Sequence, residues 1–157
     1  MAEQVSVTQD IGAPAERVWT MVSDVTRMGE WSPENDGATW LRGATGPRPG
    51  AMFRSMNHNG KKKWKTVGRI ADADPGRLLS FRITANGLKV AEWRYEFENT
   101  ATGCRVTETW IDQRGPIVKA LGKPVTGVAD RTAHNRVGME QTLEHLKAAA
   151  ESTSASD

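Results

Sequence analysis

The sequence predicts an α+β fold in which a curved antiparallel sheet of six to seven strands wraps around a long C-terminal helix and encloses a cavity. Residues 37–112 alternate between apolar and polar side chains and are interrupted by turn-forming residues. Residues 126–147 instead repeat apolar residues at intervals of three and four, as one face of a helix does. The inner face of such a sheet must be covered, and this helix is its large amphipathic cover.

The N-terminal segment is predicted to form a strand followed by two short helices. Residues 4–11 alternate, and the Gly-Ala-Pro sequence at residues 12–14 ends the strand. Its proline suits the first turn of a helix that runs to about Val22. Asp24 can cap a second short helix, which ends at Ser32-Pro33 because a residue before proline avoids the helical region. The two helices are expected to close one end of the sheet.

The central segment predicts six further strands, whose hairpin turns suggest a register. They span residues 38–42, 51–58, 61–72, 77–85, 88–99 and 103–113. Asn59-Gly60 is a strong two-residue turn signal, and a turn there places Ser55 opposite Trp64 and Phe53 opposite Thr66.

The two later hairpins behave differently. A plain two-residue loop at Asn86-Gly87 would turn Val90 away from the face of Trp93, so a longer loop or a bulge is expected there. A loop over residues 100–103 places Trp93 opposite Trp110. The same register sets Tyr95 opposite Glu108 on the inner face.

The C-terminal segment is predicted to hold a short helix from Pro116, broken near residues 122–124, and then the long helix over 126–147. Residues 148–157 have no apolar face to bury and are expected to be a disordered tail. Residues 1–147 are therefore expected to form one domain.

Three segments carry a resemblance to a known superfamily. They are APAERVWTMVSDVTRMGEWSPE at residues 13–34, GCRVTETW at 103–110 and DRTAHNRVGMEQTLEHLK at 130–147. They resemble the START-like helix-grip superfamily (SRPBCC), in its polyketide cyclase/dehydrase-type branch. The resemblance covers the chain to about Lys147 and implies the helix-grip fold. It implies no single function, because the superfamily includes lipid carriers, aromatase/cyclases and hormone receptors.

Composition argues against several classes of protein. Lys and Arg number 21 against 19 Asp and Glu, so the net charge of +2 gives little support for a nucleic-acid or anionic-membrane partner. The lone Cys104 excludes an internal disulfide, and no cluster of Cys and His suggests a metal site. No apolar run approaches the roughly 18 residues of a membrane span, and the first ten residues do not resemble a secretory signal. We expect a cytoplasmic protein without integral membrane segment, metal or cofactor.

The basic run KKKWK at residues 61–65 has two interpretations. In a strand its lysines divide between the two faces, which favours a solvated strand that resists edge-to-edge aggregation. The alternative is a protein- or RNA-interaction module that uses Lys63 and Lys65.

The candidate ligand-binding residues lie on the predicted inner face of the sheet, on the inward face of the long helix and beside the second short helix. The six tryptophans outnumber the three phenylalanines and one tyrosine. Rigid aromatic walls of this kind form either a plain core or a pocket for a flat or long apolar ligand. The candidates are Trp31, Phe53, Trp64, Phe81, Trp93, Tyr95, Glu108, Trp110, Arg131, Asn135 and Met139.

Glu108 is the most informative of these residues. By strand parity it shares the inner face with Trp110, where a carboxylate is costly unless it is paired. Tyr95 is expected opposite it, and Arg131 of the long helix is placed to reach it. This cluster either ties the helix to the sheet or orients the polar group of a ligand.

Together these observations favour a protein that binds, and as a carrier delivers, a small hydrophobic molecule such as a lipid, fatty acid or polyketide-like compound. The resemblance implies an alternative, a polyketide cyclase, aromatase or dehydratase in which Glu108 or Tyr95 moves protons. No catalytic residue is assigned, because His58, His134 and His145 have no recognisable nucleophile partner, and His145 is expected on the outer side of its helix. The sequence is compatible with a monomer and with a homodimer.

Overall fold

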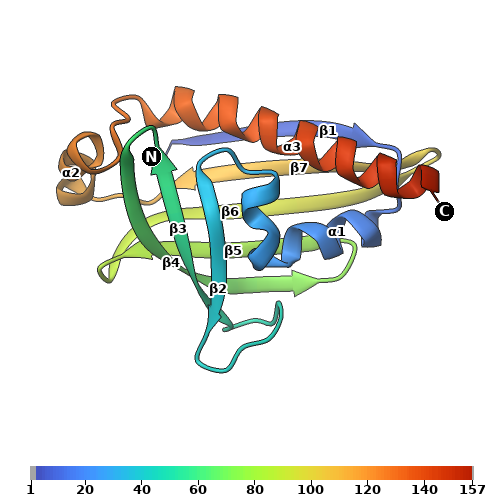
Figure 1. Cartoon of the computed structure of the whole chain (residues 1–157), viewed down its shortest axis with the longest axis horizontal. Helices are drawn as coiled ribbons and strands as arrows, with labels where there is room; N and C mark the ends of the chain where they lie inside the picture. Colours follow the sequence, from blue (N-terminus) through green and yellow to red (C-terminus); the bar gives the residue numbers. More distant parts are fainter. Residues whose placement is uncertain (1–2, 157) are drawn as a thin grey trace.

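The computed structural model describes the backbone of residues 3–156 and confirms the α+β architecture. Seven antiparallel strands form one sheet in the order β1-β7-β6-β5-β4-β3-β2, which curves around the helices (Figure 1). The strands are β1 (Gln4–Ile11), β2 (Asn35–Leu41), β3 (Met52–Asn59), β4 (Lys62–Asp74), β5 (Leu78–Ala85), β6 (Leu88–Thr100) and β7 (Gly103–Asp112). The helices are α1 (Ala15–Ser23), the short 3-10 helix η1 (Val25–Glu30), α2 (Pro116–Thr126) and α3 (Arg131–Ser156).

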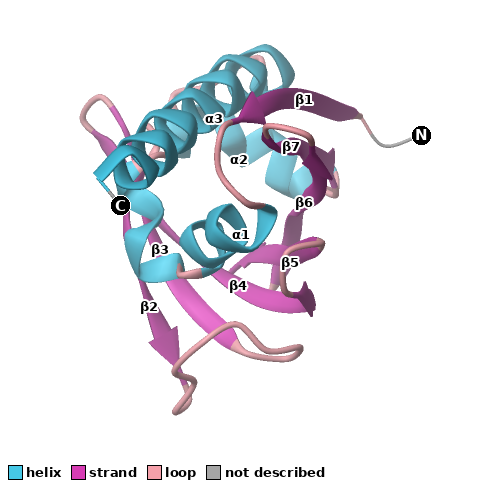
Figure 2. Ribbon diagram, turned by 90° about the vertical axis from the view of Figure 1, so that its right-hand side faces the viewer, coloured by secondary structure: helices cyan, strands magenta, loops and turns pink. Residues whose placement is uncertain are grey.

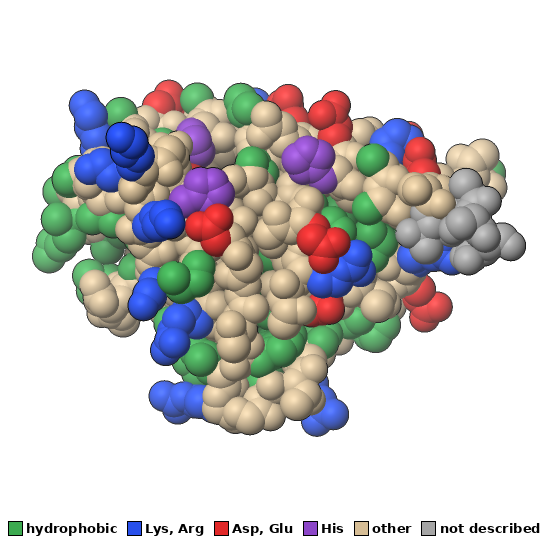
Figure 3. Space-filling model, viewed as in Figure 1, with side chains coloured by type: hydrophobic (Ala, Val, Ile, Leu, Met, Phe, Trp, Pro, Cys, Tyr) green, Lys and Arg blue, Asp and Glu red, His purple; other side chains and the backbone are tan. Residues whose placement is uncertain are grey.

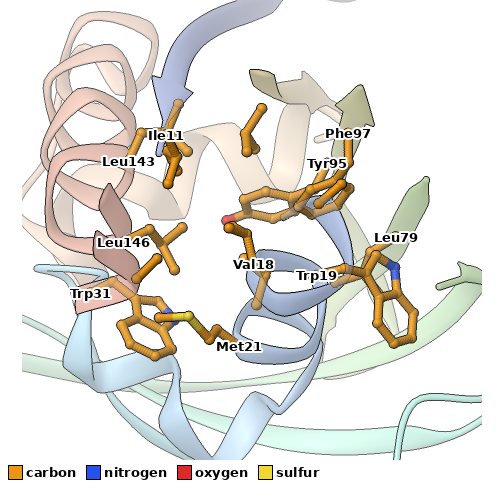
Figure 4. Close-up of a cluster of buried hydrophobic side chains, with 14 of the residues drawn as sticks. Ile11, Val18, Trp19, Met21, Trp31, Leu79, Tyr95, Phe97, Leu143 and Leu146 are labelled. Atoms are coloured by element: carbon orange, nitrogen blue, oxygen red, sulfur yellow. The ribbon is translucent and has the colours of Figure 1, made fainter. Parts of the chain in front are cut away.

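The two N-terminal helices form as predicted and close one end of the curved sheet. Pro14 precedes α1 in an extended conformation, and Asp24 caps η1 by accepting a 3.1 Å hydrogen bond from the N–H of Thr26. In Figure 2, α1 lies in the opening between α3 and the strands. Figure 4 shows its Val18 between Leu146 of α3 and the aromatic side chains on the sheet side, so α1 joins the two layers.

The β3–β4 hairpin differs from the prediction by two residues. Its loop is Gly60-Lys61, so that Ser55 pairs with Thr66 and Phe53 with Gly68. Gly60 has a φ of 60° and supplies the positive φ that the first position of a tight hairpin turn needs, which leaves Asn59 in the strand. Because side chains alternate with period two, a slip of two residues leaves every side chain on its predicted face.

The two later hairpins agree with the prediction. Asn86 and Gly87 form a two-residue loop with positive φ at both positions, and a bulge after Ile83 pairs that residue with Ala91. Because of this bulge, Ile83 and Ala91 are both buried in the core. Across β6 and β7, Tyr95 lies opposite Glu108, as predicted.

The prediction that α2 breaks near residues 122–124 is wrong. The helix continues through Pro124 to Thr126 and ends where the left-handed Gly127 donates its N–H to the carbonyl of Lys123 at 2.7 Å. Pro124 has no N–H to donate to the carbonyl of Ala120, and the helix ends only two residues after it. The long helix consequently starts at Arg131 instead of residue 126, with Asp130 accepting a 3.1 Å hydrogen bond from the N–H of Ala133.

The expected disordered tail is wrong for residues 148–152, because α3 continues past Lys147. Ala150 is fully buried, and the carboxylate of Glu151 accepts a 2.8 Å hydrogen bond from the N–H of Gly12. Ala150 thus has a surface to bury, near the end of β1. Residues 1, 2 and 157 and the side chains of residues 153–156 lie outside the described part of the chain. Among the described residues, no helix has the length and hydropathy to cross a bilayer.

Candidate functional site

A cavity of about 810 Å³ lies between the concave face of the sheet and helices α2 and α3. Ten of the eleven candidate residues line it. They are Trp31, Trp64, Phe81, Trp93, Tyr95, Glu108, Trp110, Arg131, Asn135 and Met139. The strand parity and helix periodicity that selected these residues therefore bring them together around one space.

The remaining candidate, Phe53, does not line the cavity. It is fully buried, and its ring packs edge-on against Trp40 and Phe81, with ring centroids 6.0 and 5.4 Å away. The ring also covers Gly68 on the neighbouring strand, where a Cβ would lie 2.1 Å from Cζ of Phe53. Phe53 faces inward as predicted but belongs to the core.

Tryptophans form walls on two sides of the cavity. Trp93 and Trp110 are neighbours across β6 and β7, and Trp110 is buried. Trp31 follows η1, and Figure 4 shows its ring beside Met21 of α1. The ring nitrogen Nδ1 of His145 lies 2.8 Å from the carbonyl oxygen of Trp31. His145 is exposed, as its predicted place on the outer side of α3 requires, and its ring also reaches the segment after η1.

Glu108 is a carboxyl group buried in this largely aromatic wall, with 2% of its surface exposed. The hydroxyl of Tyr95 donates a 2.8 Å hydrogen bond to Oε1, while the buried Oε2 has no hydrogen-bond partner in the described structure. Burial raises the pKa of Glu108 to about 8, although the bond from Tyr95 acts in the opposite direction. At neutral pH the group is thus mainly an uncharged acid, able to donate a hydrogen bond.

Tyr95 serves as the fixed partner of this acid. Burial raises the pKa of its hydroxyl well above the ordinary value, and the neighbouring Glu108 raises it further. Tyr95 therefore keeps its proton, which it directs toward Oε1. The pair offers one committed hydrogen bond and one free oxygen inside the cavity.

Arg131 does not reach Glu108 and instead binds Glu34. Its Nη1 lies 2.8 and 2.9 Å from the two carboxylate oxygens of Glu34 and 3.3 Å from Oδ1 of Asn135. Nε2 of His134 lies 2.9 Å from the same carboxylate. The guanidinium also lies over Trp64, 5.9 Å from the ring centroid. This cluster ties the first turn of α3 to the segment before β2.

Sequence reasoning missed several polar residues of the lining. Asn35 donates to Oγ of Ser55 at 2.7 Å, and Asn57 donates to Oγ1 of Thr66 at 3.1 Å. The signal for Ser55 and Asn57 was present, because alternation from Phe53 places both on the inner face. These polar side chains satisfy one another, in contrast to Oε2 of Glu108.

Two charged residues of the lining were also missed. Glu34 precedes β2 and meets a helix 97 residues away, which no local pattern indicates. Arg114 follows β7 and is held by both carboxylate oxygens of Asp112 at 2.9 Å. Both arginines of the lining, Arg114 and Arg131, thus already have carboxylate partners. Over the described part of the chain, no three His, Cys, Asp or Glu side chains gather to hold a metal ion.

Residues 2–151 match the model of a protein family described as polyketide cyclase / dehydrase and lipid transport. No curated protein matches the sequence.

Several solved structures share the fold. A polyketide cyclase-like protein from Corynebacterium glutamicum is 26% identical with a TM-score of 0.63, over 94% of this chain and 90% of that one. A protein from Chromobacterium violaceum is 16% identical with a TM-score of 0.69, over 94% and 97%. A di-domain ARO/CYC protein of the steffimycin biosynthetic pathway is 14% identical with a TM-score of 0.76, over 99% of this chain and 52% of that one.

Proposed function

Because the chain belongs to the polyketide cyclase/dehydrase and lipid transport family, we propose that it binds a small hydrophobic molecule in its internal cavity and carries it. The ligand class is a lipid, a fatty acid or a polyketide-like compound. The observation that carries the proposal is the cavity of about 810 Å³, with aromatic walls and one buried acid. Its volume falls within the usual range of small-molecule sites.

The cavity combines apolar aromatic walls with one hydrogen-bonding pair, and this combination supports the proposal. Trp64, Trp93 and Trp110 offer rigid apolar surface, which supplies affinity at little cost in side-chain entropy. Tyr95 and Glu108 offer a hydrogen-bonding group at a fixed place, which supplies orientation.

The test is native mass spectrometry of protein purified from its own host, followed by extraction and identification of what co-purifies. We expect a stoichiometric hydrophobic molecule that is lost on denaturation. A variant that fills the cavity, Gly138→Leu, should lose it, since Gly138 lines the cavity and a Cβ there has no neighbour closer than 3.9 Å. Gly138→Ala is the matched control, with a similar gain in helix propensity and little added volume.

Protein that carries no hydrophobic molecule and fails to take up an apolar dye such as Nile red would contradict the proposal. Equal uptake of the dye by the wild type and by Gly138→Leu would contradict the choice of cavity.

A polyketide cyclase, aromatase or dehydratase is the second candidate function. Glu108 favours it, because an acid with a pKa of about 8 can both give and take a proton near neutral pH. Stoichiometric retention of a ligand without turnover would favour the carrier. Loss of turnover with unchanged binding in Glu108→Gln would favour the enzyme.

A further inference from the structure

We infer that the cavity selects an uncharged ligand with a carbonyl or hydroxyl oxygen, which accepts a hydrogen bond from Oε2 of Glu108. This inference rests on the proposed function, because it names the chemical class of ligand for the same cavity. Of the three classes named above, it favours neutral, oxygen-bearing lipids and polyketide-like compounds and excludes an ionised fatty acid.

The two carboxyl oxygens of Glu108 differ in their hydrogen bonding. Oε1 of Glu108 accepts the proton of Tyr95, whereas Oε2 is buried without a hydrogen bond. Buried polar atoms in folded proteins are nearly always paired, because leaving one unpaired loses the hydrogen bonds it made with water. Glu108 also lines the cavity, so a molecule in the cavity is placed to supply the missing partner.

At neutral pH the hydrogen bond between Oε2 and a ligand runs from Glu108 to the ligand. The hydroxyl proton of Tyr95 is already used on Oε1. Burial keeps Glu108 mainly protonated at neutral pH, so its own proton is available on Oε2. A ligand oxygen opposite it must therefore accept, as a ketone, ester or hydroxyl oxygen does.

A negatively charged ligand is excluded because both arginines of the lining already have carboxylate partners. A carboxylate beside Glu108 would need a cation, since burying an unpaired charge is costly. Arg131 is bound to Glu34, and Arg114 is bound to Asp112. Lys65, the lysine of the lining, is exposed. Beside Glu108, on which no charged side chain acts, the cavity thus offers a neutral donor without a free counterion.

The experiment compares three ligands with one ring skeleton, namely fluorenone, fluorene and fluorene-9-carboxylate, by calorimetric titration at pH 7. Fluorene measures apolar binding alone, fluorenone adds a carbonyl and the carboxylate adds a charge. We expect fluorenone to bind about tenfold more tightly than fluorene, as one net hydrogen bond allows. The carboxylate should bind more weakly than fluorene.

Two variants distinguish the contribution of the Glu108 carboxyl group to ligand binding from that of the apolar cavity walls. Glu108→Leu combined with Tyr95→Phe, which leaves no freed tyrosine hydroxyl as a substitute donor, should bind fluorene at least as tightly as the wild type but lose the preference for fluorenone. Glu108→Gln keeps a neutral N–H donor of similar size and should retain a preference.

Equal affinity of the wild type for fluorenone and fluorene would overturn the inference and leave the proposed function standing. The same holds if the carboxylate binds most tightly. A protein that binds none of the three would contradict the proposed function and this inference with it.

A separate observation at the α2 end of the molecule carries a second inference. Ile117, Leu121 and Val125 recur every four residues on one face of α2 and are 68%, 53% and 43% exposed. Leu88 at the start of β6 and Val137 of α3 are also exposed. We call these five residues the apolar rim. Four of them, all but Ile117, also line the cavity.

Basic side chains accompany the apolar rim. Lys119 and Lys123 lie on α2, and Lys61 and Lys62 lie at the β3–β4 turn, where Nζ of Lys62 donates to the carbonyl of Pro124 at 3.0 Å. Figure 3 shows hydrophobic side chains gathered at the α2 end, with Lys and Arg beside them. The nearly balanced net charge thus coexists with a local concentration of lysines.

We propose that the apolar rim docks on an anionic phospholipid bilayer, with α2 lying in the interface. Exposed aliphatic side chains flanked by lysines are the composition of interfacial helices, and each lysine near an anionic leaflet adds attraction. The rim lacks the Tyr, Trp and Arg anchors that concentrate in protein–protein interfaces. Docking there would let an apolar ligand enter the cavity without crossing water.

Co-sedimentation with phosphatidylcholine vesicles, with and without phosphatidylserine, tests this proposal. We expect binding to the anionic vesicles that weakens with added salt. Ile117→Ser with Leu121→Ser should reduce it by at least tenfold, and Lys119→Glu with Lys123→Glu should abolish it.

Met56→Ser is the matched control, because Met56 is 41% exposed on β3 outside the rim and the cavity lining. The control should bind like the wild type. Failure of the wild type to bind anionic vesicles would overturn the proposal, as would an acidic protein partner that needs the rim while vesicles do not bind. Equal loss in the control would also overturn it.

Discussion

The hydroxyl of Tyr95 lies 2.8 Å from Oε1 of Glu108, and the two residues face each other directly across strands β6 and β7. Both side chains are buried. The phenol occupies one carboxyl oxygen and so decides that the other, Oε2, is the oxygen available to the cavity. The chemistry of the site therefore depends on the protonation of a single carboxyl group.

Replacing Glu108 by Gln should change how stability depends on pH. The folded pKa of Glu108 is about 8, above its ordinary 4.5, because the cavity wall buries the carboxyl group, and this effect outweighs the hydrogen bond from Tyr95, which lowers the pKa. The stability gained from holding the proton is complete below pH 4.5 and is lost as the pH rises through 8. The free energy of unfolding of the wild type should thus fall, relative to Glu108→Gln, by about 1.4 kcal/mol per pH unit between about pH 5 and 8.

Chemical denaturation of both proteins at several fixed pH values checks this prediction. If the free energies of unfolding of the two proteins differ by the same amount at every pH, Glu108 titrates near its ordinary value.

Replacing Tyr95 by Phe should destabilise the protein by about 1–3 kcal/mol, because Oε1 of Glu108 would lose its buried donor. The loss of the bond should also raise the pKa of Glu108 further, since that bond lowers it. A double-mutant cycle with Glu108→Leu, which removes the acceptor, measures the pair, and we expect a coupling of about 1 kcal/mol. Additive effects of the two substitutions would argue against the bond.

Replacing Gly68 by Ala should destabilise the core by about 1–3 kcal/mol, as overpacking does. The new Cβ would lie 2.1 Å from Cζ of Phe53, whose ring covers the glycine. Thermal unfolding measures the effect, and Gly46→Ala is the control because no atom lies within 4 Å of a Cβ there. Similar melting temperatures for the two variants would contradict the packing described for Phe53.

Replacing Glu34 by Gln should cost about 2 kcal/mol, because Arg131 is only 12% exposed and would lose its carboxylate. Asp10→Asn removes an ion pair with Arg105 in which both side chains are more than half exposed, and should cost much less than Glu34→Gln, because solvent screens the pair. Urea denaturation of the two variants compares them. Equal costs would mean that the Glu34 cluster does not anchor α3.

The sequence predicted the register around Glu108 because the loop position and the face pattern of β6 and β7 agreed. In the β3–β4 hairpin the faces were right but the pairing was two residues out, because parity does not change with a slip of two. Phe53 also shows what strand alternation cannot predict. Its inward direction followed from alternation, whereas its place in the core depends on Trp40, Gly68 and Phe81, which only the folded chain brings together.

Long-range partners were beyond local patterns. Arg131 was predicted to reach Glu108, but it meets Glu34, a residue of an irregular segment whose position no periodicity fixes. The tail was predicted to be disordered from its composition, whereas Ala150 and Glu151 contact parts of the chain that are distant in sequence.

The most direct measurement is a crystal structure of the protein with fluorenone. We predict that the rings lie among the tryptophans of the cavity, with the ketone oxygen about 2.7 Å from Oε2 of Glu108, the usual length of an O–H···O hydrogen bond. A ketone oxygen directed away from Glu108, or a cavity closed by side chains with no ligand inside, would contradict it.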